Sequence, residues 1–237
     1  MRHHGSEQEH AAKREDRRRR ERAQDLGDGP TFGEALAATG LLAVTSRATR
    51  SIIERAEAVI RDGARVQLSV VSCDTCTATK SCCTLRTTAW LHEAVPIADR
   101  LRREGRDTPE LREALRTSAR LMDTLTSDSY SRPCVFLDAS ERCTVYTDRP
   151  SVCGTTFVAT PPELCNTRGA QVRKYTHPLA EASATAQSVF EQQLALPPVP
   201  GSYLRPLPRV VLLCLEAWDR RDFASYLTSK LTATAAG

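Results

Sequence analysis

Nine cysteines constrain this chain more than any other feature, because eight of them fall within residues 73–165 of its 237 residues. In a reducing compartment such a set is not expected to form a disulfide framework, and its odd number and clustering favour metal ligation or redox chemistry. Aromatic residues make up 5% of the sequence, and much of its 41% hydrophobic fraction is alanine. The chain therefore offers little large apolar surface, and we expect some of its stability to come from something other than packing.

The N-terminal residues, MRHHGSEQEH, lack the apolar core of a signal peptide, and the run from Val210 to Leu215 is far too short to cross a bilayer. We therefore expect a soluble, cytoplasmic protein with no membrane partner. The net charge of +4, from 33 basic and 29 acidic residues, is too small to indicate nucleic-acid binding. The sequence names no protein partner.

The first 34 residues predict a disordered, charged tail, because this segment carries few large apolar residues and includes the turn signal Gly-Asp-Gly-Pro. Its arginine run, Arg17 to Arg20, could contact RNA, DNA or anionic lipid, but acidic residues in the same tail nearly cancel its charge. Residues 35–235 predict a single α-rich domain with the cysteine core at residues 70–166.

The expected fold class is mainly α, with a small β-hairpin and irregular cysteine-rich loops organised around a metal site. Thr108 is the expected N-cap of one helix, ahead of Pro109. The hairpin is expected at residues 134–146, where apolar triplets flank a turn-forming stretch, and an extended segment is expected at residues 66–71. Apolar spacing and composition predict helices over residues 49–61, 89–103, 109–126, 178–194 and 210–231.

The first cysteine block has the pattern Cys73-x2-Cys76-x5-Cys82-Cys83. A C-x2-C turn places both sulfurs on one side, where they can bind one metal. Adjacent cysteines usually point in different directions, so Cys82 and Cys83 either serve two centres or include one packing residue. The spacing does not distinguish these alternatives.

The second block contains Cys134, Cys143 and Cys153, whose spacing suits a hairpin and a following helix that converge on one point. Pro150 marks the expected start of that helix, so we expect the helix dipole to lower the pKa of the Cys153 thiol and favour the ligating thiolate. Cys165 lies close enough in sequence to be an eighth ligand, and eight thiolates would suit two four-coordinate centres.

Other candidate groups are interpreted as structural. Cys214 lies in an apolar run and is expected to be a packed core thiol. His92 and His177 are isolated, and each is interpreted as a surface or hydrogen-bonded histidine. Glu93 follows His92, but the sequence places no nucleophile or second carboxylate beside it. No phosphate loop, dinucleotide fingerprint or Ser-His-Asp order is found, so the sequence leaves open whether the protein is an enzyme.

The segments CDTCTATKSCC and PCVFLDASERCTVYTDRPSVC resemble the YkgJ-type cysteine-cluster family, the CxxCxxCC type, which is described as a zinc- or iron-chelating domain. The resemblance covers about residues 70–166. Two features depart from the family pattern: the gap between Cys76 and Cys82 is longer, and Gly154 stands where the family usually has an arginine. The most specific matching residues are Cys134, Phe136, Leu137, Cys143, Tyr146, Arg149, Pro150 and Cys153.

The clustered thiols and the resemblance together predict a metal-binding protein that carries an iron-sulfur cluster or zinc and serves in storage, redox sensing or scaffold support. One branch of the family, the flagellin lysine N-methylase, implies the alternative of an enzyme whose cluster supports S-adenosylmethionine-dependent methyl transfer or electron transfer. An open coordination position would favour the enzyme, and a closed four-thiolate centre would favour the structural role.

Arg149 and Tyr146 could hydrogen-bond to the sulfurs or offset the negative charge of the thiolates, although a role in the turn and the helix start explains these residues equally well. The expected metal ligands are Cys73, Cys76, Cys82, Cys83, Cys134, Cys143, Cys153 and Cys165.

Overall fold

The computed structural model describes residues 29–63, 81–126, 129–158, 160–161, 164–165, 171, 174–176, 182–197, 199 and 203–233. Five features predicted from the sequence therefore lie outside the described residues: the charged tail before Gly29, the extended segment 66–71, Cys73, Cys76 and His177.

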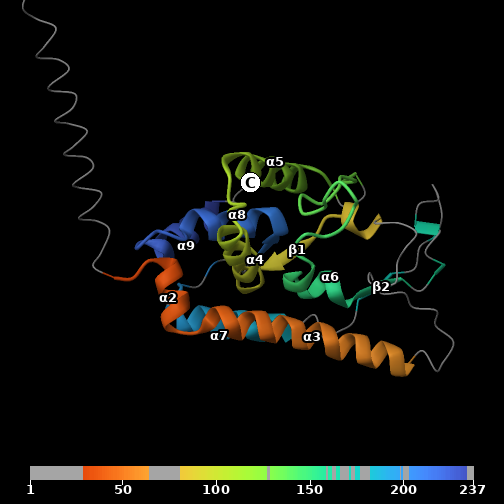
Figure 1. Ribbon diagram of the computed structural model, residues 1–237, viewed down its shortest axis with the longest axis horizontal. Helices are drawn as coiled ribbons and strands as arrows, with labels where there is room; N and C mark the ends of the chain where they lie inside the picture. The colour runs from red at the N-terminus through yellow and green to blue at the C-terminus, as the bar shows by residue number, and fades with distance from the viewer. Residues whose placement is uncertain are drawn as a thin grey trace, which may run out of the picture.

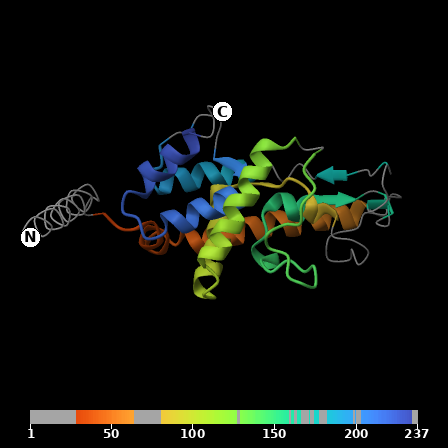
Figure 2. The same cartoon turned by 90° about the horizontal axis from the view of Figure 1, so that it is seen from above.

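The described residues are mainly helical, which confirms the predicted fold class. Figures 1 and 2 place α2 and α9 at one end of the molecule and α6 with the strand that follows it at the other. The helices are α2 (Phe32–Ala38), α3 (Leu41–Gly63), α4 (Leu91–Arg103), α5 (Pro109–Thr124), α6 (Ser151–Thr155), α7 (Ala182–Gln193), α8 (Leu207–Ala217) and α9 (Phe223–Ala233), with short 3-10 turns η1 (Ser81–Thr84) and η2 (Tyr146–Asp148).

Two small antiparallel strand pairs join segments that are distant in sequence. Strand β1 (Thr88–Trp90) pairs with β4 (Leu204–Pro206), and β2 (Thr156–Val158) pairs with β3 (Lys174–Thr176). Ala89 lies opposite Arg205 in the first of these pairs. Because β1 follows the Cys82–Cys83 turn and β2 follows the Cys153 helix, each pair holds one cysteine-bearing segment against the rest of the chain.

The hairpin expected at residues 134–146 is present only as one antiparallel bridge, between Leu137 and Cys143. The Asp138 carboxylate accepts hydrogen bonds from the backbone N–H groups of Ser140 (2.8 Å) and Arg142 (2.9 Å). Glu141 has a φ of 57°, in the left-handed region. An aspartate whose carboxylate accepts hydrogen bonds from amides that follow it in the chain favours a compact turn. This turn replaces the longer strands of the expected hairpin.

Helix α8 is the centre of the hydrophobic core and packs against both α4 and α5. Val210 and Val211 are completely buried, as expected for the apolar stretch of a core helix. Cys214 is also completely buried, with its sulfur 4.0 Å from the carbonyl oxygen of Leu91. The prediction that Cys214 is a core thiol is therefore confirmed.

The helical region predicted over residues 210–231 is divided into α8 and α9 by the turn that follows Ala217. The carbonyl oxygens of Trp218 and Arg220 accept hydrogen bonds from the first amides of α2, at Gly33 and Phe32, each at 3.0 Å. Gly33 permits this contact, because a Cβ there would lie 2.5 Å from Nε1 of Trp218. The break therefore serves as the docking point of α2.

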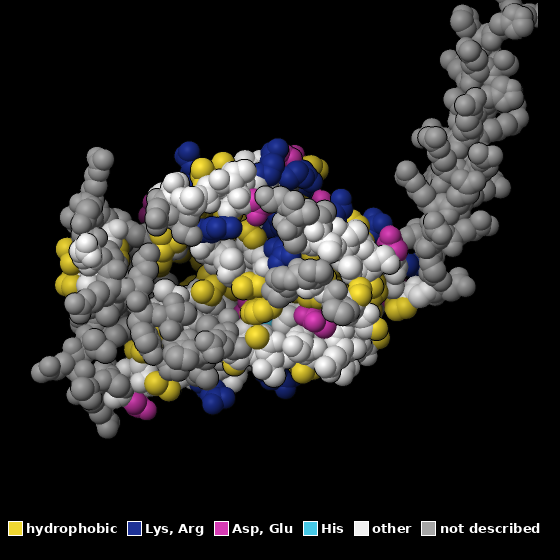
Figure 3. Space-filling view, turned by 180° about the vertical axis from the view of Figure 1, so that it is seen from behind, with side chains coloured by type: hydrophobic (Ala, Val, Ile, Leu, Met, Phe, Trp, Pro, Cys, Tyr) yellow, Lys and Arg dark blue, Asp and Glu magenta, His cyan; other side chains and the backbone are white. Residues whose placement is uncertain are grey.

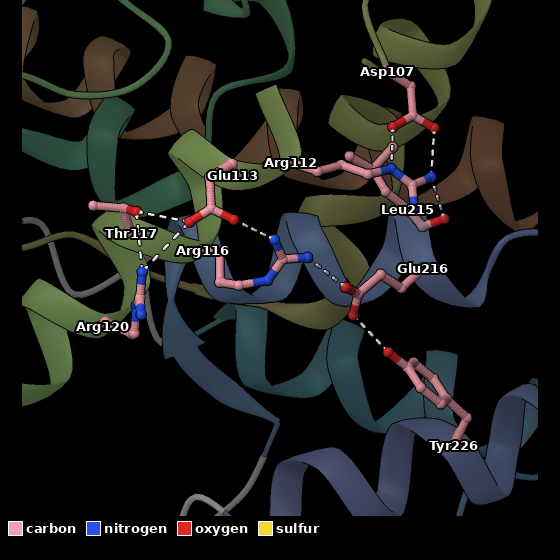
Figure 4. Close-up of polar contacts among 9 residues, drawn as sticks. All are labelled: Asp107, Arg112, Glu113, Arg116, Thr117, Arg120, Leu215, Glu216 and Tyr226. Atoms are coloured by element: carbon pink, nitrogen blue, oxygen red, sulfur yellow. Dashed lines mark hydrogen bonds and ion pairs between the residues drawn. The ribbon is translucent and has the colours of Figure 1, made fainter. Parts of the chain in front are cut away.

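Polar side chains join α5 to α8, as Figure 4 shows. Arg112 donates to both carboxylate oxygens of Asp107, at 2.7 and 2.8 Å, and to the carbonyl oxygen of Leu215 at 3.2 Å. The N-cap prediction for α5 is confirmed, since Thr108 accepts a hydrogen bond from the Leu111 amide (3.2 Å). Bidentate arginine pairs of this kind give geometric specificity, and here they fix α5 over the core.

Helix α3 is longer than the predicted 49–61 segment and contacts α4, α6 and α7 (Figure 1). Its buried face includes Thr49, Ile53 and Ala56. Among the described helices, none combines the length and apolar character that a bilayer crossing demands.

Candidate metal centre

Five of the predicted cysteine ligands line one cavity of about 470 Å³. They come from three separate parts of the chain, namely η1, the bridged turn and α6, and each is partly buried. The fold therefore brings together thiols that are up to 71 positions apart in sequence, as the difference between 153 and 82 shows. The five are Cys82, Cys83, Cys134, Cys143 and Cys153.

Backbone hydrogen bonds hold the two cysteine blocks side by side. The Cys134 amide donates to the carbonyl oxygen of Cys83 (2.8 Å), and the Arg132 amide donates to that of Thr84 (3.2 Å). The Leu137–Cys143 bridge then returns the chain to the same wall of the cavity. This ladder fixes the positions of the thiols without using their side chains.

Two arginines, one in α4 and one just after it, anchor the loop that follows Cys143. Arg100 donates to the Thr147 hydroxyl (2.6 Å) and pairs with Asp148 at 2.9 Å. Arg106 donates to the Thr144 hydroxyl at 2.8 Å. The second cysteine block is therefore attached to α4 and to the turn that follows it.

Arg149 is a cationic group beside the cavity, and it is only 8% exposed. Its guanidinium pairs with Glu57 of α3 at 3.2 Å and stacks over the Tyr146 ring, 3.9 Å from the ring centre. Its charge acts to lower the pKa of the Cys153 thiol. Arg149 and Tyr146 thus have structural partners, and the charge of Arg149 also favours the thiolate form of Cys153.

Helix α6 packs so closely on α3 that any side chain at position 154 would meet Ile53. A Cβ on Gly154 would lie 2.5 Å from Cδ1 and 2.5 Å from Cγ1 of Ile53, which is far inside van der Waals contact. An arginine at this position, as in the family pattern, would have to displace α6 from α3. The close approach of α6 to α3 therefore accounts for glycine rather than arginine at position 154.

The prediction that the helix dipole lowers the pKa of Cys153 is wrong for the metal-free protein. Burial raises the pKa of this thiol, and the neighbouring Cys134, Cys143 and Glu93 raise it further. Burial likewise raises the pKa of Cys134 to about 11, with a contribution from Cys143. The five-residue α6 cannot outweigh these effects, because its N-terminus is already occupied by the carboxyl group of Glu93, to which the Ser151 amide donates (2.9 Å).

The cavity thiols share a space but do not form a finished coordination sphere. Within the described part of the chain, no three histidine, cysteine, aspartate or glutamate side chains lie close enough together to hold a metal ion. Cys165 is partly buried and is not among the described residues that line the cavity. Thiolates are nevertheless suited to zinc and to iron-sulfur clusters, so the donor set fits a thiophilic metal.

Sequence reasoning overlooked two further arginines at the cavity, Arg86 and Arg142. Arg142 directly precedes Cys143, and Arg86 lies three residues after Cys83, so proximity to the cysteine blocks was an available signal. His92, by contrast, is fully buried, and its Nδ1 lies 3.0 Å from Oε1 of Gln187. This position agrees with the interpretation of His92 as a hydrogen-bonded histidine.

Residues 72–177 match the family model CxxCxxCC, described as a "putative zinc- or iron-chelating domain". The match begins just before Cys73 and ends beyond β3, so it includes all five cavity cysteines. The match over this segment confirms the resemblance read from the sequence. Neither the curated proteins nor the solved structures gave a match to the chain.

Proposed function

We propose that this protein binds zinc or an iron-sulfur cluster through thiolates gathered at the cavity. The observation that carries the proposal is that Cys82, Cys83, Cys134, Cys143 and Cys153 all line one cavity. Burial raises the pKa of the Cys134 thiol to about 11, so the metal would take the place of the thiol protons when it binds. The family description as a zinc- or iron-chelating domain supports the same class of function.

The chain's own residues would prepare this site in two ways. The amide ladder between Cys134 and Cys83 holds the two cysteine blocks in register before any metal arrives. Arg149, buried at the cavity wall, offsets part of the negative charge that several thiolates would bring. We propose that Cys73 and Cys76 complete the ligand set, because a C-x2-C pair grips one metal.

Alanine at any one of the cavity cysteines is expected to remove most of the bound metal, because each substitution deletes a donor atom. Metal content per chain, measured on protein purified without oxygen, checks this for Cys83, Cys134, Cys143 and Cys153. Alanine at Cys214 is the matched control, since it removes a fully buried sulfur from the core of α8 and should leave the metal in place. Equal metal loss from the Cys214 variant would contradict the assignment of ligands.

The metal content of the Cys165→Ala variant distinguishes a protein with one metal centre from a protein with two. With eight thiolates in two centres, this variant should lose a defined fraction of the metal while the cavity centre persists. With a single centre at the cavity, its metal content should equal that of the unmodified protein.

A further inference from the structure

Glu93 is an almost fully buried carboxyl group, 2% exposed, that joins the start of α4 to α6 and α7. Its Oε2 accepts a hydrogen bond from the Trp90 amide (3.0 Å) at the junction of β1 and α4. Its Oε1 accepts from the Ser151 amide (2.9 Å), the first residue of α6, and from the Ser183 hydroxyl (3.0 Å) on α7. Burying a carboxyl group is costly unless it is hydrogen-bonded, and three donors meet that cost here.

The contacts of Oε1 exceed what a helix cap requires. Capping of α4 needs only the bond between Oε2 and the Trp90 amide. The second oxygen reaches instead across to α6 and α7, where the Ser183 and Ser151 hydroxyls also lie 2.8 Å apart. The carboxyl group therefore connects β1, whose Thr88 lines the cavity, with α6, whose Cys153 lines it too.

Helix α6 depends on anchors outside itself. It has five residues, and the amides of Cys153 and Gly154 both bond to the same carbonyl, that of Pro150, at 3.0 and 3.3 Å. So short a helix is not stable alone. The Gly154 contact with Ile53 holds one side of it, and the bond from the Ser151 amide to Glu93 holds its first residue.

We infer that Glu93 is a positioning residue for the metal centre, which holds α6 so that Cys153 faces the other thiols. The inference rests on the proposed metal binding. Glu93 touches no metal in this assignment and acts through Ser151, two residues before Cys153. In other metal sites, residues that do not touch the metal orient the ligands through hydrogen bonds, and Glu93 would act in the same way.

Glu93→Ala is expected to weaken metal binding about 10- to 100-fold, the range typical for loss of such a partner. Titration with Co²⁺, read from the sulfur-to-cobalt charge-transfer bands, gives the affinity and shows the loss of one thiolate. In the metal-free protein, iodoacetamide should modify Cys153 faster in the variant than in the unmodified chain, as mapped by mass spectrometry. Cys214 should stay protected in both, since it reports unfolding of the core.

Two further variants separate positioning from charge and from misfolding. Glu93→Gln keeps an oxygen for Ser151 and Ser183 while removing the charge, and it should bind Co²⁺ nearly as the unmodified protein does. Ser151→Pro deletes the donated N–H at a helix position that tolerates proline, and it should reproduce the Glu93→Ala result. Pro150 already has the extended backbone, φ −59° and ψ 155°, that a following proline requires.

Gln187→Ala is the matched control for general destabilisation. Gln187 is buried on α7 and accepts from the His92 amide on α4 (3.0 Å), so it joins the same two helices without touching α6. This variant should unfold at a lower temperature while its Co²⁺ bands and Cys153 protection stay unchanged. Equal effects from Gln187→Ala and Glu93→Ala would overturn the inference, as would an unchanged Cys153 in Glu93→Ala.

The two proposals can fail separately. If the unmodified protein binds neither Zn²⁺ nor Co²⁺ and carries no iron-sulfur cluster, the proposed function is wrong. Comparing Cys153 alkylation in Glu93→Ala with that in Glu93→Gln, which removes the same charge, still decides whether Glu93 positions Cys153. If the unmodified protein binds metal and Glu93→Ala binds it equally well, only the positioning role is lost.

Discussion

Gly154→Arg should destabilise the protein by more than the roughly 1–3 kcal/mol that an overpacked core position usually costs. The Cβ alone would lie 2.5 Å from Ile53, and the guanidinium would have no room between α6 and α3. Gly154→Ala should cost less, about 1–2 kcal/mol, because alanine regains part of the loss through its higher helix propensity. Chemical denaturation of both variants gives the free energies of unfolding.

Ile53→Ala provides the matched test of that contact. Alone it should cost about 2–5 kcal/mol, as expected when a buried isoleucine is truncated. Combined with Gly154→Ala it should cost clearly less than the sum of the two single changes, because the truncated side chain leaves space for the new Cβ. Strict additivity would mean that residues 53 and 154 are not in contact.

Removal of the metal is the second change with a large expected effect. Structural thiolate sites contribute on the order of 10 kcal/mol of apparent folding free energy, and this chain has a modest supply of large apolar side chains. Chelation should therefore loosen the cysteine segments, which without metal are held by few bonds, such as that from the Cys134 amide to Cys83, while the α4, α5 and α8 core persists. Hydrogen exchange measured by mass spectrometry resolves the two regions.

The expected pattern is faster exchange in residues 81–84 and 132–158, with unchanged protection in α8. The Cys134→Ala variant is the control, because a protein that already lacks the metal should not respond to the chelator. Uniform loss of protection across α8 would show that the metal supports the whole fold, and no change anywhere would show that it supports none of it.

Local signals in the sequence predicted most of the helices. Thr108 caps α5 as expected, and the apolar positions Ile53 and Ala56 face the core from α3. Helix α2 was overlooked although its signal is local: Thr31 and Glu34 form a capping box, with bonds of 3.3 and 2.7 Å. The predicted domain boundary at residue 35 remains a prediction.

Features that depend on long-range contacts could not be predicted. The break before α9 depends on α2 bonding to the carbonyl oxygens of Trp218 and Arg220. The direction in which the pKa of the Cys153 thiol shifts depends on burial and on Glu93, which is 60 positions away in sequence. The cysteine spacing indicated that the thiols share a site, and the tertiary fold decided which of the described cysteines reach it.

The candidate site residues likewise divide into those with a local sequence signal and those without one. The pattern of the second block, which combines turn and helix-start signals, indicated that Cys134, Cys143 and Cys153 share a site, and the three line one cavity in the structure. Cys165 has no such signal beyond nearness in sequence, and it is not among the described residues that line the cavity. Glu93 was set aside for lack of a nearby catalytic partner, yet its partners are backbone amides, which carry no sequence signature.

The central claim is that the gathered thiols hold a metal, and metal analysis of the full chain purified without oxygen tests it most directly. We expect stoichiometric zinc in a colourless protein, or iron with the visible absorption of an iron-sulfur cluster. A folded, metal-free protein that takes up neither zinc nor iron on reconstitution would contradict it.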